Sequence, residues 1–113
     1  MSQKVPLLTL SVVAAALIAA DRFITGAGVY PAAGAGARGV AATDAAAIGD
    51  LVPVDVLGTS VVTAGAAIAK DAKVQIGTDG KVITLAAGVA VGVALEAAAS
   101  DGDKLEIFLI PNA

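Results

Sequence analysis

The chain of 113 residues contains no cysteine, no histidine and no tryptophan. Without cysteine it can form neither a disulfide nor a thiolate metal site. Without histidine it lacks the most frequent general base and the commonest protein ligand for metals. These absences argue against triad hydrolases and most zinc enzymes. We therefore expect a protein that is not an enzyme, with no catalytic residues, no cofactor and no metal site.

Aromatic and basic residues are also scarce. The aromatic side chains are Phe23, Tyr30 and Phe108, the net charge is −3, and the seven basic residues are scattered along the chain. Nucleic-acid-binding proteins place basic residues along one face or interleave them with stacking aromatics. Neither pattern is present here, and we expect no nucleic-acid partner.

Small side chains dominate the apolar residues. Hydrophobic residues make up 58% of the chain, but many of them are alanine, which buries little surface. Burial stabilises by roughly 25 cal/mol per Å² of apolar surface, so such a core is thin for a single domain of this length. A thin core favours a partner surface, and we expect a self-associating or attached subunit.

The most apolar stretch, residues 5–20, has two interpretations. Lys4 followed by this stretch resembles a short signal peptide, although the apolar run is too short for a convincing membrane span. Alternatively, the alternation of Leu8, Leu10 and Val12 with polar or outward positions predicts a strand. We divide the chain into an apolar segment, residues 1–20, that is an arm or a first strand, and a β-rich domain, residues 21–113.

The rest of the chain alternates short β-type runs with tight polar turns. Asp79-Gly80 marks a hairpin turn, and the Gly/Ala-rich residues 32–39 predict a flexible loop or an arm. Pro53 cannot donate a ladder hydrogen bond, which places its strand at a sheet edge or a bulge. We predict an all-β fold, a small antiparallel barrel or sandwich, with strands over residues 40–42, 51–57, 60–63, 73–77, 81–85, 88–96 and 104–110.

The last of these strands carries large apolar side chains on both faces. Leu105, Ile107 and Leu109 alternate as a core-facing set. Phe108 and Ile110 fall on the opposite face, where they are either part of a core on that side or a contact surface.

Three patterns could suggest chemistry, and each has a simpler structural explanation. Asp101-Gly102-Asp103 reads as a turn, because it lacks the ligand spacing of a calcium loop. The letters G-x-G-x-x-G at residues 34–39 lack the strand and helix that a phosphate loop requires. Lys81 follows a hairpin turn, as the modified lysine of a biotinyl or lipoyl carrier does, but the residues that flank that lysine in carriers are absent.

Three segments carry a family resemblance: GDLVPVDVLG at residues 49–58, residues 64–74, and VGVALEAA at residues 91–98. Over residues 20–110 the chain resembles the capsid cement, or head decoration, proteins of tailed bacteriophages. The resemblance implies a small β-rich protein made in the host cytoplasm that binds the outer surface of a mature head. There it clamps adjacent major capsid subunits, usually as a homotrimer and in some cases as a dimer, without a membrane partner.

The resemblance also implies a contact surface. We expect capsid or inter-subunit contacts from the apolar segment, the strand near Pro53 and the outer face of the last strand. The candidate residues are Val5, Leu7, Leu8, Leu10, Pro53, Phe108 and Ile110. Two alternatives stay open: a secreted or cell-surface structural β-protein with a cleaved signal, and a carrier or small-ligand-binding β-barrel.

Overall fold

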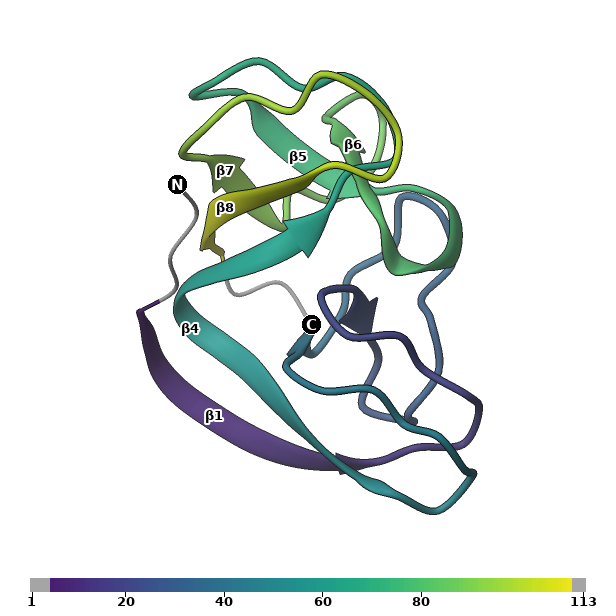
Figure 1. Cartoon of the computed structure of the whole chain (residues 1–113). Helices are drawn as coiled ribbons and strands as arrows, with labels where there is room; N and C mark the ends of the chain where they lie inside the picture. The colour runs from purple at the N-terminus through teal and green to yellow at the C-terminus, as the bar shows by residue number, and fades with distance from the viewer. Residues whose placement is uncertain (1–4, 111–113) are drawn as a thin grey trace.

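The computed structural model describes residues 5–110, which form one antiparallel sheet of eight strands (Figure 1). The strands are β1 (Pro6–Val13), β2 (Phe23–Ile24), β3 (Gly39–Ala41), β4 (Leu51–Thr63), β5 (Lys73–Ile76), β6 (Val82–Thr84), β7 (Gly92–Ala94) and β8 (Lys104–Leu109). A short 3₁₀ turn, η1 (Thr78–Gly80), joins β5 to β6. The predicted all-β class is confirmed; the sheet folds over itself like a sandwich and does not close into a barrel.

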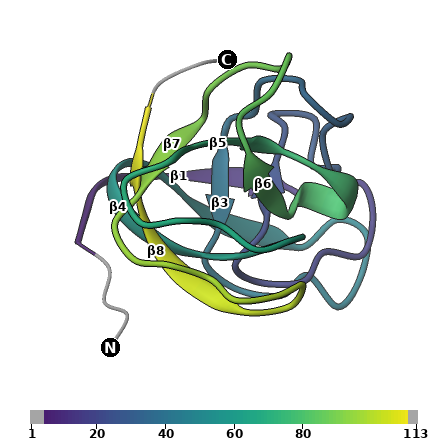
Figure 2. The same cartoon turned by 90° about the horizontal axis from the view of Figure 1, so that it is seen from above.

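Strand β4 is the centre of the sheet. Its first half pairs with β1 and with β3, and its second half pairs with β8. The remaining strands extend the sheet in the order β2-β3-β4-β8-β7-β5-β6. Seen from above, the strands curve around the interior, with β8 on one side and β5 on the other (Figure 2).

The two strands predicted at residues 51–57 and 60–63 are one continuous strand, β4. Gly58 joins them with a φ of +94°, a conformation that glycine adopts without strain, and the pairing with β1 shifts register beside it. Of the two alternatives predicted for the strand of Pro53, the sheet edge is wrong, because β4 has neighbours on both sides there. The other alternative, a bulge, agrees with the register shift in the pairing with β1 between Leu57 and Asp55. Pro53 lies at the last rung beside β3, where its carbonyl accepts from the amide of Ala42 and no proline N–H is needed.

The predicted hairpin around Asp79-Gly80 is confirmed as β5 and β6. The predicted strand over residues 88–96 is shorter and comprises β7 alone. Gly92 lies so close to β8 that an added Cβ would stand 2.8 Å from Ile107 Cδ1 and 2.9 Å from the Phe108 carbonyl oxygen. The Gly/Ala-rich loop is fixed to the domain, because the Gly34 amide donates to the Ile76 carbonyl at 2.7 Å.

The sheet is built from one motif that occurs twice. The first motif comprises residues 6–56 and the second comprises residues 56–109, so that β4 ends one and begins the other. The pairing of β1 with β4 recurs between β4 and β8: Val13 lies opposite Leu51, as Thr63 lies opposite Lys104. The pairing of β2 with β3 recurs in the same register between β5 and β7. The pairing of β3 with β4 recurs in the same register between β7 and β8.

The turns of the two motifs repeat as well. The equivalent residues Asp21 and Asp71 both have a positive φ, of 63° and 68°, and so do Gly49 and Gly102. The Asp21 amide donates to the Ala41 carbonyl, and the Asp71 amide donates to the Ala94 carbonyl, each at 2.8 Å. Because backbone hydrogen bonds and special φ angles both recur, the repeat is structural and not a coincidence of alanine-rich composition.

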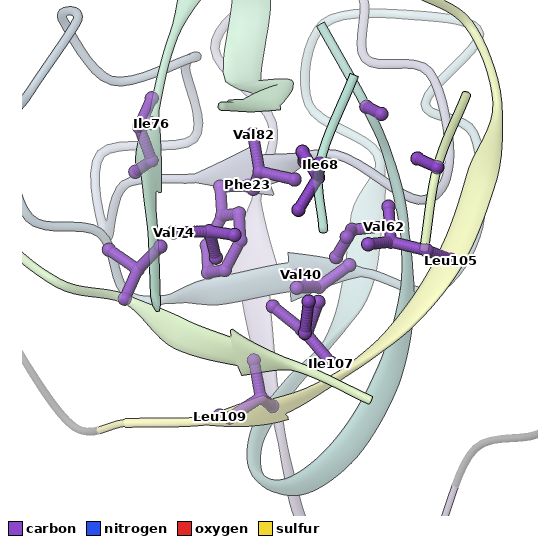
Figure 3. Packing of buried hydrophobic residues seen from close by; sticks show 14 of the residues in the cluster. Phe23, Val40, Val62, Ile68, Val74, Ile76, Val82, Leu105, Ile107 and Leu109 are labelled. Atoms are coloured by element: carbon purple, nitrogen blue, oxygen red, sulfur yellow. The ribbon is translucent and has the colours of Figure 1, made fainter. Parts of the chain in front are cut away.

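The two motifs have separate core clusters that correspond residue by residue. The cluster of the first motif contains Val12, Ala14, Ile18, Ile24, Ala41, Ala45, Val52 and Val54. Their counterparts in the second motif are Val62, Ala64, Ile68, Val74, Ala94, Ala98, Leu105 and Ile107. Phe23 and Val40 belong to the first motif but pack into the second cluster, beside Val74 and Ile107 (Figure 3). The second core is therefore larger and is completed by the first motif, and Leu105, Ile107 and Leu109 are core residues as predicted.

Candidate functional site

The most prominent surface feature is the apolar strand β1. Although the strand is paired with β4, most of its large side chains are exposed, as is the residue before it: Val5, Leu7, Leu8, Leu10 and Val13. Leu7 has the greatest exposed fraction, 75%. Contiguous exposed apolar side chains on a soluble domain mark a surface that binds another macromolecule. Residues 6–13 form the predicted strand, but the prediction that its alternating set faces the core is wrong for Leu8 and Leu10, because only Val12 of that set is buried. The exposed side chains form the first candidate contact surface.

Strand β1 is an edge strand of the sheet. Strand β4 covers one edge, and the other edge of β1 has no strand beside it in the described part of the chain. An unpaired apolar edge is a liability that proteins normally cover. The edge and the side chains beside it are therefore available to a partner, which agrees with the expectation of a subunit that associates.

Exposed apolar residues also line the adjoining end of β4. Leu51 pairs with Val13 across the two strands, and both side chains are exposed. Pro53 is half-buried opposite Ser11, two residues along the same pair of strands. These contacts extend the apolar surface of β1 over the start of β4, and sequence reasoning missed Val13 and Leu51 as members of it.

A second apolar surface lies on the other motif. Phe108 is 51% exposed on β8 and shares a rung with Val93 of β7, which in turn pairs with Lys73 of β5. The interpretation of Phe108 as a core residue is therefore wrong, whereas Ile110 is half-buried. The aromatic ring lies outside because the inward-facing neighbours Ile107 and Leu109 already fill the core side of β8.

A buried carboxylate lies between the motifs. Asp55 is 2% exposed, and its oxygens accept from the hydroxyl of Ser60 at 2.9 Å and from that of Thr9 at 3.3 Å. Hydrogen bonds of this kind offset the desolvation of a buried polar group. Asp55 thus ties β1 to the two halves of β4 and has a structural role in forming the surface above it.

The residues that suggested chemistry serve turns. Asp103 accepts from the amides of Ala99 and Ser100, which satisfies the backbone of its own loop. Lys81 forms an ion pair with Asp101 at 3.1 Å. Gly34 and Gly39 lie in a loop and at the start of a strand, with no helix after them. None of these positions has the geometry of a calcium loop, a phosphate loop or a carrier lysine.

Two hollows open on the described surface. One is lined by Leu17, Ile18, Tyr30 and Asp44, and another lies beside Lys81 and Asp101. Within residues 5–110 no three acidic, cysteine or histidine side chains gather closely enough to hold a metal ion. The same residues include no helix of the length and apolar character needed to cross a membrane. The candidate site is accordingly a pair of apolar surfaces and not a cleft.

Comparison with known proteins assigns the chain to a class. A model of the phage cement protein family matches residues 2–109, and the chain belongs to that family. The family resemblance seen in the sequence is thereby confirmed, and it identifies a structural protein of phages.

A solved structure shares the fold. The crystal structure of the head fiber gp8.5 N base in bacteriophage phi29 superposes with a TM-score of 0.76 at 22% sequence identity. The match covers 91% of this chain and 93% of the phi29 chain. No curated protein sequence matches significantly.

Proposed function

We propose that this protein binds the outer surface of a phage head and cements adjacent major capsid subunits, which stabilises the mature head. Membership of the phage cement family, together with the exposed apolar surface of β1, carries this proposal. We further propose that it acts as a homotrimer. The phi29 protein of similar fold is itself described as a head fiber, which agrees with a position on a phage head.

The physical basis of cementing is differential binding. A protein that binds the assembled lattice and not the dissociated subunits shifts the equilibrium toward the lattice. Many identical copies add their contributions, and an oligomer that contacts several subunits gains further through multivalency. Such a protein needs an apolar contact surface and no catalytic group, which corresponds to the surfaces described above.

We assign the capsid contact to the amino-terminal end of β1 and the residue before it, where Val5, Leu7 and Leu8 are exposed. Pro53 is left out of this contact, because β4 is flanked on both sides and cannot add a capsid strand. Deleting residues 1–12 is a poor test of attachment, since it removes most of a paired strand and the buried Val12. A single substitution on the exposed side is sharper.

The test uses heads of the cognate phage assembled without this protein. The wild-type protein should co-sediment with these heads and raise the temperature at which they rupture. Leu7→Asp should lower the affinity at least tenfold, because it places a charge in an apolar contact. The matched control is Ile48→Asp, at a position 72% exposed on a turn outside β1. Wild-type protein that does not bind heads, or equal binding by Leu7→Asp, would contradict the proposal.

A further inference from the structure

Within one chain, the two motifs contact each other through a turn of the first motif and a strand edge of the second. On the first motif the Asp21 carbonyl accepts from the Thr63 amide at 2.8 Å, and the Asp21 carboxylate lies 3.4 Å from Lys104 Nζ. On the second motif Thr63 lies at the outer edge of β4, and its hydroxyl accepts from Lys104 Nζ at 2.7 Å. The Asp21 turn therefore covers the edge of the second motif's first strand.

Because the motif occurs twice, the turn has a counterpart in the second motif and the strand edge has a counterpart in the first, and these two counterparts do not contact each other within the chain. The counterpart of Thr63 is Val13, at the outer edge of β1. The counterpart of the Asp21 turn is the Asp71 turn, which has the same backbone conformation and is exposed. In the first motif Val13 occupies the non-hydrogen-bonded rung with Leu51, so its amide points away from β4. The strand edge with the Val13 amide donor and the turn with the Asp71 carbonyl acceptor thus lie at opposite ends of the repeat.

Side-chain exposure shows what the missing neighbour would cover. Thr63 is 4% exposed in the second motif, whereas its counterpart Val13 is 57% exposed. Ser60 is 1% exposed, and its counterpart Leu10 is 38% exposed. The first strand of the motif is covered where a preceding motif is present and is bare where none is present.

The opposite end of the repeat has the matching surface. In the first motif the rung of Phe23, Val40 and Asp55 is buried against the second motif. The equivalent rung of the second motif is Lys73, Val93 and Phe108, in which Lys73 and Phe108 are exposed. This rung has an exposed aromatic side chain next to the Asp71 turn, on the face that would continue the repeat.

We propose that a second copy of this chain covers β1. The second motif of that copy packs against the first motif of this chain, in the same way as the first motif packs against the second motif within one chain. The Asp71 turn of one copy lies on the Val13 edge of the next, and Phe108 and Val93 of that copy pack toward Leu10. The contact is head-to-tail, so a closed ring of copies covers the Val13 edge of every copy. The Lys104–Asp21 ion pair is not repeated in it, because Leu51 is the counterpart of Lys104, and the contact between copies is the more apolar one.

This inference deepens the self-association in the proposed function but does not require capsid binding, so it is tested without heads. The mass of the wild-type protein in solution, by light scattering, should be a multiple of the 10.8 kDa chain. Val13→Lys and Phe108→Lys should each reduce it to a single chain with an unchanged far-UV circular dichroism spectrum. The control Ile48→Lys, at a position even more exposed but outside the contact, should keep the wild-type mass. A wild-type monomer, unchanged mass in either variant, or an equal loss in the control would overturn the proposal.

The orientation is tested by cross-linking, which the absence of native cysteine makes clean. Val13→Cys and Asp71→Cys proteins, mixed and oxidised, should form a disulfide-linked dimer, because adjacent backbones place Cα atoms about 5 Å apart. Neither protein should form it alone. A dimer of the Val13→Cys protein with itself would indicate a two-fold contact between β1 edges, and that result or the absence of any mixed dimer would overturn the head-to-tail arrangement. A wild-type protein that forms this oligomer but does not bind heads would contradict the proposed function and leave this inference standing.

Discussion

Phe23 joins the two motifs energetically, and replacing it with alanine tests the description of the core. Its side chain is 1% exposed and belongs to the cluster of the second motif, although β2 belongs to the first. A buried phenylalanine removes about 150–250 Å² from water, which at 25 cal/mol per Å² is about 4–6 kcal/mol for the residue. The alanine retains part of this area, so Phe23→Ala should lower the free energy of unfolding by about 3–5 kcal/mol.

That loss is a large share of the total stability. A domain of this size is stable by about 5–15 kcal/mol, and a loss of 1 kcal/mol lowers its melting temperature by roughly 4 °C. Phe23→Ala should therefore lower the melting temperature by about 12 °C or more. Phe23→Leu, which keeps most of the volume, should lose about 1 kcal/mol. The exposed Leu17→Ala, in the same motif, should change stability by less than about 0.5 kcal/mol.

Urea unfolding followed by circular dichroism measures the free energies, and amide hydrogen exchange shows where the loss falls. In Phe23→Ala the amide of Ile107, in the second motif, should exchange faster, because Phe23 packs on that cluster. The reasoning would be refuted by a loss below 1 kcal/mol. Unchanged exchange at Ile107 with faster exchange at Val54 would also refute it, since Phe23 would then support its own motif alone.

Two further pairs of substitutions test the junction between the motifs and the close packing at a glycine. Asp55→Ala should destabilise the protein by about 1–3 kcal/mol in urea unfolding, because it leaves the buried Ser60 hydroxyl without its acceptor, and adding Ser60→Ala should cost little more. Gly39→Ala should lower the melting temperature more than Gly49→Ala does. A Cβ at Gly39 collides with the Asp55 carbonyl. A Cβ at Gly49 has open space, and this substitution should cost about 1 kcal/mol through the positive φ. Additive effects of the first pair, or a reversed order in the second, would contradict these contacts.

Local pattern was sufficient to predict much of this fold. The alternation around Leu105 located the last strand and its core face, and Asp79-Gly80 located the hairpin. The edge position predicted from Pro53 was wrong. Proline is excluded from a central strand only at a rung that needs its N–H, and the sequence does not show where β3 ends. Alternation placed Phe108 on the face opposite Leu105 but could not show whether that face is buried, since both faces of β8 carry large apolar residues.

The internal repeat was visible in the sequence but weak. Val12-x-Ala14 and Ile18-Ala19-x-Asp21 recur as Val62-x-Ala64 and Ile68-Ala69-x-Asp71. In an alanine-rich chain such matches carry little weight until backbone hydrogen bonds support them. Recognising them would have predicted the turns at both aspartates, the shared strand and the bare counterpart of Thr63, which composition and alternation could not supply.

The shared strand has a mechanical consequence. β4 runs unbroken through both motifs, with β1 along its first half and β8 along its second (Figure 1). A force that pulls β1 away along its length acts on a whole ladder of hydrogen bonds in shear, and β4 passes it through Gly58 to the ladder with β8. Bonds loaded together resist more than bonds opened one at a time. A strain at one partner contact would thus be carried to the other end of the molecule by a single stretch of backbone.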